Sequence, residues 1–285
     1  MLFFILYKIG EFTALVLPLK AAYAVADIVS YIKYFFSFCE KKEMVENLRI
    51  ILPDEDTKTL KRYSRQIFTN FSRYLVDFFR FKKLDLKYME EHVEIINKRY
   101  VDEALQKGRG AIMLSAHVGN WELGGAVMGL MGYPINVVAL EHKNKSINDF
   151  FVKQRKSKNE TIIPLKYAVR KCLKALADNE LIGIVADKDY TNNGIVVKFF
   201  GTDTLMPIGP AAFNLKTGAA IVPGYLTRVK DDNFQLIFEE PIKYCPTGDF
   251  AADIRLLTEE CTRRLENAIR KDLTQWYCFR RFWLR

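Results

Sequence analysis

The chain has 285 residues, which is enough for one sizeable α/β core and does not require a second one. Its 43 basic and 34 acidic residues give a net charge of +9, a balance that suits anionic lipid headgroups, an acidic protein or nucleic acid. The sequence has no zinc-finger spacing, no RNA-binding aromatic signature and no basic low-complexity tail, so nucleic acid is not expected as a partner.

The five cysteines are scattered, odd in number and never spaced as Cys-x-x-Cys. This pattern indicates reduced thiols in a reducing compartment and excludes a disulfide framework.

Residues 1–38 are strongly apolar and aromatic, but charged residues interrupt them before any run reaches the 18 residues that a spanning helix needs. No basic region precedes the first apolar residues, so a cleavable signal is not expected. We expect an N-terminal amphipathic segment of one or two helices, broken near Pro18, that lies on or dips into one leaflet of a membrane. The alternative is an ordinary helical subdomain packed on the core.

Apolar residues between 60 and 78 recur at three- and four-residue spacing, which predicts an amphipathic helix that ends at Arg80. Its polar side is basic, and could be a solvated face or a docking face for an acidic partner. A short helix is expected before it, ending ahead of Pro53.

From residue 88 onward, short apolar runs alternate with helical patterns. Strands are predicted at 93–96, 111–116, 135–140, 161–165, 181–186, 196–200, 220–226 and 234–239. Helices are predicted at 100–107, 146–158, 167–178, 209–216 and 250–271. The alternation predicts an α/β fold with a mostly parallel central sheet flanked by helices. We therefore divide the chain into an N-terminal membrane-associated segment, 1–38, and an α/β domain, 39–285.

The stretch 110–131 reads as strand, glycine-rich polar turn and helix. It places His117 at the carboxyl end of a strand, where open α/β sheets bind ligands. Asn120 is the expected N-cap, which puts Glu122 in the first turn, where the helix dipole favours a carboxylate.

His117 and Glu122 would diverge by about 140° on one continuous helix, since each residue turns the helix by about 100°. With His117 in the turn instead, the Glu122 carboxylate can reach one ring nitrogen and leave the other free as a base. The alternative is a buried histidine that a local carboxylate merely satisfies.

Other polar residues also follow predicted strands. Glu141 closes the strand 135–140, and a neighbouring position in the sheet would bring it near His117, although it could equally belong to a polar loop. Asp187 and Asp189 follow the strand 181–186, so they also reach the carboxyl edge. Arg155 lies in a basic cluster on the helix 146–158.

The basic cluster comprises Lys153, Arg155, Lys156 and Lys158, and could face an acidic helix of a protein donor or only solvent. No metal site is expected, because His117 would be the single nitrogen ligand among the acidic groups. A hydrolase built on Ser115 is disfavoured because Gly-x-Ser-x-Gly is missing.

The block His117-Val-Gly-Asn-Trp-Glu122 resembles the catalytic block of the lipid A biosynthesis acyltransferases, of lauroyl and myristoyl transferase type. These belong to the lysophospholipid acyltransferase superfamily, whose glycerolipid members carry His-x4-Asp. Blocks similar to later parts of the family follow in the same order, at 197–201, 206–209, 220–223 and 275–282. Lys188 departs from the pattern, since similar enzymes often have glutamine there.

The resemblance implies a membrane-associated acyltransferase on the cytoplasmic face of the inner membrane. It implies His117 and Glu122 as catalytic residues, and a cleft that binds substrate. The residues implied in substrate binding are Glu141, Arg155, Asp187 and Asp189. The donor would be a thioester of acyl carrier protein or coenzyme A, with no other cofactor, and the anionic membrane surface would be a further partner.

The acceptor implied is a glycolipid hydroxyl, first of all that of a lipid A precursor. The alternatives are another glycolipid of the phosphatidylinositol mannoside type, a glycerolipid, or a non-catalytic lipid-binding protein of the same fold. The intact His-Glu pair favours an enzyme, and glutamate in place of aspartate disfavours a glycerolipid acceptor.

Overall fold

The computed structural model describes residues 2–283, so Met1, Leu284 and Arg285, at the outer ends of the ranges 1–38 and 39–285, lie outside the described residues. Within them a seven-stranded sheet has the order β1-β9-β8-β2-β5-β3-β4. Its strands are β1 (Val93–Ile96), β2 (Ala111–Ser115), β3 (Ile135–Ala139), β4 (Thr161–Pro164), β5 (Leu181–Val185), β8 (Ala220–Arg228) and β9 (Phe234–Phe238). All neighbours are parallel except β8 and β9. The predicted mostly parallel sheet is confirmed.

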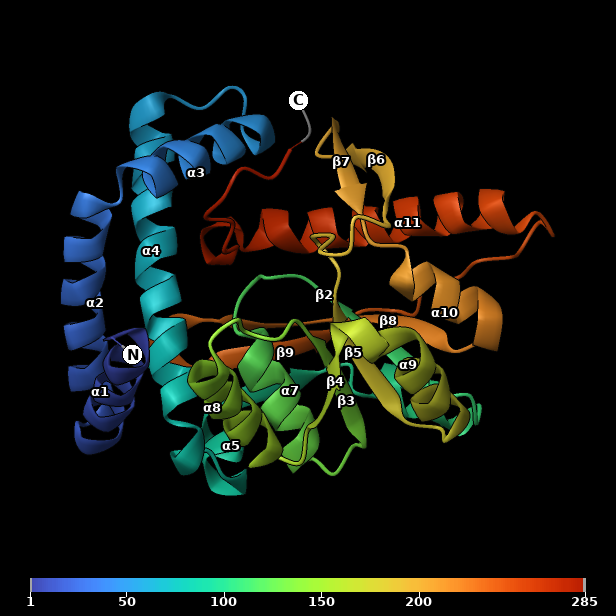
Figure 1. Ribbon diagram of the computed structural model, residues 1–285, viewed down its shortest axis with the longest axis horizontal. Helices are drawn as coiled ribbons and strands as arrows, with labels where there is room; N and C mark the ends of the chain where they lie inside the picture. The colour runs from blue at the N-terminus through green and yellow to red at the C-terminus, as the bar shows by residue number, and fades with distance from the viewer. Residues whose placement is uncertain (1, 284–285) are drawn as a thin grey trace.

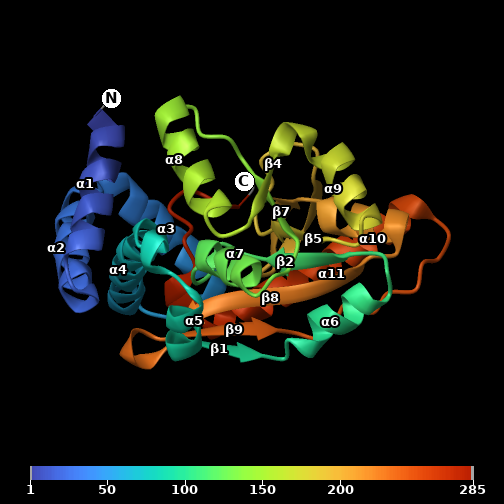
Figure 2. The same ribbon diagram turned by 90° about the horizontal axis from the view of Figure 1, so that it is seen from below.

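Helices cover both faces of this sheet (Figure 2). They are α6 (Arg99–Gln106), α7 (Trp121–Leu130), α8 (Lys145–Lys156), α9 (Ala168–Ala177), α10 (Gly209–Thr217) and α11 (Phe250–Lys271). Because side chains alternate along a strand, Ile112 and Leu114 of β2 enter the core beneath α9, α10 and α11, whereas Ala111 and Met113 enter the core beneath α6 and α7. β2 is therefore buried from both sides.

One predicted strand does not belong to the sheet. The residues predicted at 196–200 form β6 (Ile195–Phe199), which pairs antiparallel with β7 (Thr202–Met206) as a separate hairpin. The turn between them uses Phe200 at φ 49° and Gly201 at φ 78°, the left-handed pair that a two-residue hairpin loop requires. β7 was not predicted, and the hairpin packs against α11.

The N-terminal helices are α1 (Leu2–Val16), α2 (Leu19–Phe36), α3 (Phe38–Ile51) and α4 (Thr57–Phe79), followed by the short α5 (Leu86–His92). Single 3₁₀ turns lie at Phe81–Lys83, Leu165–Tyr167, Lys230–Asp232 and Leu273–Gln275. The predicted break at Pro18 is confirmed, and Arg80 Nη1 donates to the carbonyl oxygens of Ala14 and Leu17 beside it. α1 and α2 lie along α4 at one side of the molecule (Figure 1).

The outer faces of these helices carry large exposed apolar side chains. On α1 they include Ile5, Leu6, Ile9, Phe12 and Val16, and on α2 they include Val25, Ile28, Val29, Ile32, Phe35 and Phe36. Among the described residues, no helix has both the length and the apolar character needed to cross a bilayer.

The inner face of α2 docks through a buried polar cluster. The Asp77 carboxylate of α4 accepts hydrogen bonds from Tyr23 of α2, from Arg228 at the end of β8, and from Asn120 Nδ2 at 3.0 Å. Burial raises the pKa of Asp77. Burial alone would lower the pKa of Arg228, but the Asp77 carboxylate raises it above its ordinary value, so the guanidinium keeps its charge. The cluster joins α2, α4, β8 and the turn that contains His117.

Replacing Asp77 by alanine should destabilise the protein by about 3–5 kcal/mol, because it leaves the largely buried Arg228 cation with only the more exposed Asp232 carboxylate at 3.4 Å. Urea unfolding followed by circular dichroism measures this loss. The matched control is Asp178→Ala, whose carboxylate pairs with Lys174 at the surface and should change stability by less than about 1 kcal/mol. Equal effects of the two substitutions would contradict a stabilising role for the buried pair.

Candidate active site

The register between β2 and β5 brings His117 and Asp187 together. Ser115 at the end of β2 pairs with Val185 at the end of β5, and both chains continue beyond the sheet in the same direction. Two residues further on, His117 Nδ1 lies 2.7 Å from Asp187 Oδ1. The two side chains therefore meet at the carboxyl edge of adjacent parallel strands, where α/β folds place their ligands.

Asp187 holds the imidazole in one orientation. Its buried carboxylate also accepts the backbone N–H of His117 at 3.1 Å and the indole N–H of Trp276 at 2.9 Å. A carboxylate can only accept hydrogen bonds, so His117 Nδ1 carries a hydrogen atom and donates a hydrogen bond to Asp187. Nε2 of the neutral ring is then left with a lone pair, as a general base requires.

The pKa values of this pair move apart. Burial lowers the pKa of His117, but the adjacent Asp187 carboxylate and its hydrogen bond raise it overall above the ordinary value. Burial raises the pKa of Asp187, but the His117 ring, Trp276 and the His117 backbone N–H together hold it below its usual range. Asp187 is therefore ionised at neutral pH.

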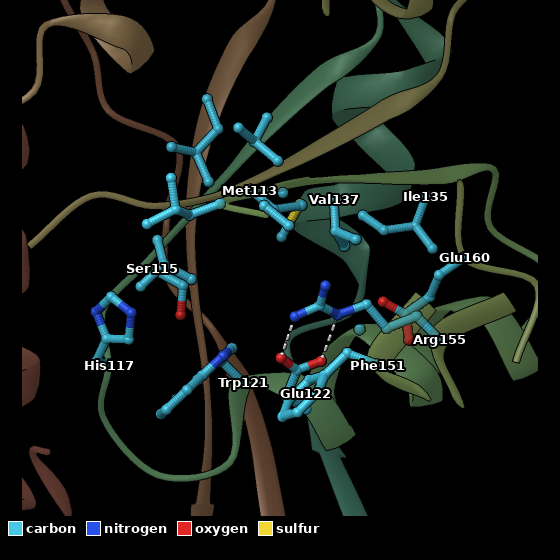
Figure 3. Close-up of a pocket in the computed structure, with 18 of the residues that line it drawn as sticks. Met113, Ser115, His117, Trp121, Glu122, Ile135, Val137, Phe151, Arg155 and Glu160 are labelled. Atoms are coloured by element: carbon cyan, nitrogen blue, oxygen red, sulfur yellow. Dashed lines mark hydrogen bonds and ion pairs between the residues drawn. The ribbon is translucent and has the colours of Figure 1, made fainter. Parts of the chain in front are cut away.

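The predicted contact between Glu122 and His117 is wrong. Asn120 caps α7 as expected by accepting the N–H of Leu123, and Glu122 lies in the first turn. From there its buried carboxylate turns away from His117 and accepts two hydrogen bonds from Arg155 of α8, from Nε at 2.8 Å and Nη2 at 2.6 Å (Figure 3). The guanidinium fork matches both carboxylate oxygens, which a single imidazole nitrogen cannot do.

Backbone hydrogen bonds to β8 and to the C-terminal segment hold the turn between β2 and α7 in place. The N–H of Gly119 donates to Gln275 at 2.9 Å, the N–H of Asn120 donates to Leu226 at 2.7 Å, and the N–H of Tyr277 donates to the carbonyl oxygen of His117 at 2.9 Å. Gly119 has φ 65°, and a Cβ there would lie 2.0 Å from the Leu226 carbonyl oxygen. Only glycine fits this position, which fixes where His117 stands.

A pocket of about 470 Å³ opens beside His117 (Figure 3). The His117 side chain is 25% exposed there. Most of the lining is apolar, and it comes from α1 and α4 as well as from the sheet. These apolar residues include Tyr7, Phe71, Leu75, Met113, Met128, Ile135, Val137, Phe151, Leu226, Leu236 and Phe238. The pocket can therefore hold a hydrocarbon chain with one end beside the imidazole.

Two of the predicted site residues lie farther from the imidazole. β5 separates β3 from β2, so Glu141 is not next to His117 and instead lies 3.4 Å from Lys166 Nζ. Asp189 accepts hydrogen bonds from the backbone and hydroxyl of Thr191. Both residues line the pocket, and their role in substrate binding stays a prediction.

The predicted basic cluster on α8 does not form one face. The Arg155 side chain is 13% exposed and pairs with Glu122, whereas Lys158 is buried with Nζ bonded to the carbonyl oxygen of Leu84 at 2.5 Å. Lys153 and Lys156 alone remain exposed. Since burying a lysine requires a partner for its ammonium group, Lys158 has a structural role and cannot face a donor.

Sequence reasoning missed two other parts of the site. Trp276 lies in the tail that resembles the family's ending, but nothing local predicts its bond to Asp187. Glu160 follows α8 in a short polar loop, yet it is buried in the pocket wall. Within residues 2–283, no three His, Cys, Asp or Glu side chains are grouped so as to hold a metal ion.

A buried carboxylate that orients an imidazole at the mouth of an apolar pocket is the arrangement of an enzyme that activates a hydroxyl group beside a lipid chain. The sequence matches the family described as bacterial lipid A biosynthesis acyltransferase over residues 2–285. The chain therefore belongs to this family of acyltransferases.

Two mycobacterial relatives are named for an acceptor lipid other than lipid A. A phosphatidylinositol mannoside acyltransferase of Mycolicibacterium smegmatis is 34% identical over 163 residues, which are 56% of this chain and 54% of that protein. The phosphatidylinositol mannoside acyltransferase of Mycobacterium tuberculosis strain H37Rv is 27% identical over 222 residues, which are 75% of this chain and 68% of that protein. The chain thus matches about half the length of the first relative and about two thirds of the second.

The Asp187→Asn variant tests how His117 is activated. Loss of the carboxylate should lower kcat by about 10²–10⁴-fold, because the ring is no longer held as the Nδ1–H tautomer. The base works unprotonated, so the wild-type rate should fall as the pH drops through a His117 pKa above about 6.5. In Asp187→Asn this fall should move to lower pH.

A pH–rate profile of acyl transfer makes the comparison, and Asp203→Asn on the exposed β6–β7 hairpin is the control. A profile that stays in place in Asp187→Asn would show that another group sets the pKa of the base.

Proposed function

We propose that this protein transfers a fatty acyl chain from a thioester to a hydroxyl group of a glycolipid at a membrane surface. The observation that carries the proposal is the imidazole of His117, fixed by Asp187, at the mouth of an apolar pocket. Membership of an acyltransferase family supports the reaction class. A non-catalytic lipid-binding role is disfavoured, because binding alone does not require a buried carboxylate that orients a base.

In the proposed reaction, His117 Nε2 takes the proton of the acceptor hydroxyl as its oxygen attacks the thioester carbonyl carbon. The tetrahedral intermediate then collapses, the C–S bond breaks, and the imidazolium returns the proton to the leaving thiolate. Asp187 stabilises the imidazolium that forms between these steps. Direct transfer accounts for the chemistry without an acyl-enzyme.

The developing oxyanion needs hydrogen-bond donors. The backbone N–H groups of His117, Gly119 and Asn120 already donate within the protein, so the turn offers little. Arg155 uses Nε and Nη2 on Glu122, and its third nitrogen, Nη1, has no hydrogen-bond partner within residues 2–283. Figure 3 shows this nitrogen turned away from Glu122 toward the pocket. Because Arg155 lies across the pocket from His117, this nitrogen faces a bound lipid away from its reacting end rather than the oxyanion.

Two classes of glycolipid are candidates for the acceptor, and a different comparison supports each of them. The family is described by lipid A biosynthesis, which favours a lipid A precursor. The mycobacterial relatives are named for phosphatidylinositol mannosides, which favours that class instead. The donor carrier is acyl carrier protein or coenzyme A, and only Lys153 and Lys156 of the predicted basic cluster remain exposed for an acidic carrier.

Mass spectrometry of products from purified protein tests this function. Acyl carrier protein and coenzyme A thioesters are each offered with a lipid A precursor, a phosphatidylinositol mannoside and a lysophospholipid. One glycolipid should gain one acyl chain, and His117→Ala should lower the rate by about 10²–10⁴-fold. Transfer only to the lysophospholipid, or equal transfer by His117→Ala, would contradict the proposal.

We further propose that α1 and α2 attach the protein to the cytoplasmic face of the inner membrane without crossing it. Their exposed apolar side chains form a surface that a lipid interface would cover. Tyr7 of α1 lines the pocket, so this surface adjoins the site where a lipid chain would enter. The basic net charge of +9 favours anionic headgroups.

The double substitution Ile28→Glu with Ile32→Glu tests this attachment, since both side chains are exposed on α2. Each buried isoleucine contributes about 1.5–3 kcal/mol, so sedimentation with phosphatidylglycerol vesicles should fall at least about tenfold. High salt should release wild type only in part, because apolar insertion is not screened. Deleting α1 and α2 is a poorer test, since it removes Tyr23 from Asp77.

The control for this experiment is Leu256→Glu on α11, which lies on the other side of the molecule from α2 (Figure 1). It should sediment like wild type. Wild-type protein that stays in the supernatant at every vesicle concentration would rule out the attachment.

A further inference from the structure

The pocket wall contains a carboxyl group that no protein group satisfies. Glu160 lines the pocket with a relative exposure of 4%, and its side chain makes no hydrogen bond within residues 2–283. Its Oε1 is fully buried without a partner. Buried polar groups are nearly always paired, and Oε1 is out of reach of a ligand, so a partner that comes with the ligand must contact the other carboxyl oxygen, Oε2.

The space for this carboxyl group is provided by α7. A Cβ at Gly125 would lie 2.8 Å from Glu160 Oε2, so the helix backbone lets the carboxyl group approach only because that residue is glycine. In Figure 3, Glu160 lies beside Arg155, on the opposite side of the pocket from His117. Glu160 is therefore placed to contact a bound chain away from its reacting end.

The charged groups near Glu160 determine which kind of ligand group its carboxyl group can bind. Burial and the nearby Glu122 carboxylate raise the pKa of Glu160 well above its ordinary value, which favours the neutral carboxylic acid. Arg155 is already neutralised by Glu122. A neutral carboxylic acid both donates and accepts a hydrogen bond, as a hydroxyl group also does. An anionic ligand group would find no free cation at this part of the wall.

We propose that Glu160 is a specificity residue that recognises a hydroxyl group carried on a lipid chain in the pocket. The proposal rests on the glycolipid acyltransferase function and narrows its substrate class to hydroxylated chains. The hydroxyl group can belong to the acyl chain of the donor or to a chain of the acceptor lipid. The apolar lining accepts the hydrocarbon, and the Glu160 carboxyl group supplies a polar contact on the side of the pocket away from His117.

Competition between matched substrates tests the proposal. In the first arm, the acceptor is fixed and saturated acyl coenzyme A competes with hydroxylated counterparts of equal length, with the hydroxyl group moved along the chain. In the second arm, the donor is fixed and the acceptor lipid carries or lacks a chain hydroxyl. Wild type should prefer a hydroxyl at one position by about tenfold in kcat/KM in one of the arms, which identifies the source.

Substitutions at position 160 assign the preference to this side chain. Glu160→Leu should bring the ratio of kcat/KM for hydroxylated over unsubstituted substrate close to one. Glu160→Gln should retain most of the preference for the hydroxylated substrate, since an amide also donates and accepts hydrogen bonds. Gly125→Ala should lower the ratio as well, by displacing the carboxyl group while leaving residue 160 intact. The control Glu103→Leu, on an exposed part of α6, should leave both ratio and rates unchanged.

A third arm does not depend on turnover. Calorimetry of the full-length protein with hydroxylated and unsubstituted fatty acids should show the same preference, and the same loss in Glu160→Leu. A wild-type ratio near one in every arm would overturn the proposal and leave ordered water as the partner of Glu160. Transfer to no acceptor, together with a hydroxyl preference in calorimetry, would overturn the proposed function but not the site.

Discussion

The register between β2 and β5 is the constraint on which the site depends. Two parallel strands paired Ser115 to Val185 leave the sheet together, and their next residues bring a histidine and an aspartate within 2.7 Å. A shift of one residue would turn either side chain to the other face of the sheet. Residues of both strands enter the cores on both faces of the sheet, so these cores hold this register and with it the geometry of the His117–Asp187 pair.

The turn that carries His117 is held by segments far apart in the sequence. Asp77 of α4 binds Asn120, and the tail at Gln275 and Tyr277 binds the backbone on the other side. Because Asp77 also binds Tyr23 of α2, the proposed membrane surface and the turn share one buried carboxylate. Such buried pairs add little net stability over apolar packing, but they allow only one arrangement of their partners. The cluster therefore serves more to fix the position of the turn that carries His117 than to add to the stability of the fold.

The sequence predicted the parts that local patterns determine. Alternating strands and helices, the break at Pro18, the Asn120 cap and the position of His117 at a strand end are all confirmed. The partner of His117 depends on strand order instead, and no local pattern reveals that β5, rather than β3, lies beside β2. The same limit explains Glu141, which follows a strand two places away, and Lys158, whose partner is the carbonyl oxygen of Leu84.

The two acidic residues near His117 have different partners, and this difference explains the His-x4-Glu spacing in physical terms. Asp187 faces His117, so Glu122 is not needed to orient the ring. Without Glu122, however, Arg155 would be a largely buried cation with no carboxylate bonded to it, which is strongly unfavourable. By binding two of the guanidinium nitrogens, Glu122 fixes the direction of the third, toward the pocket. The glutamate of the block thus acts on the arginine rather than on the histidine.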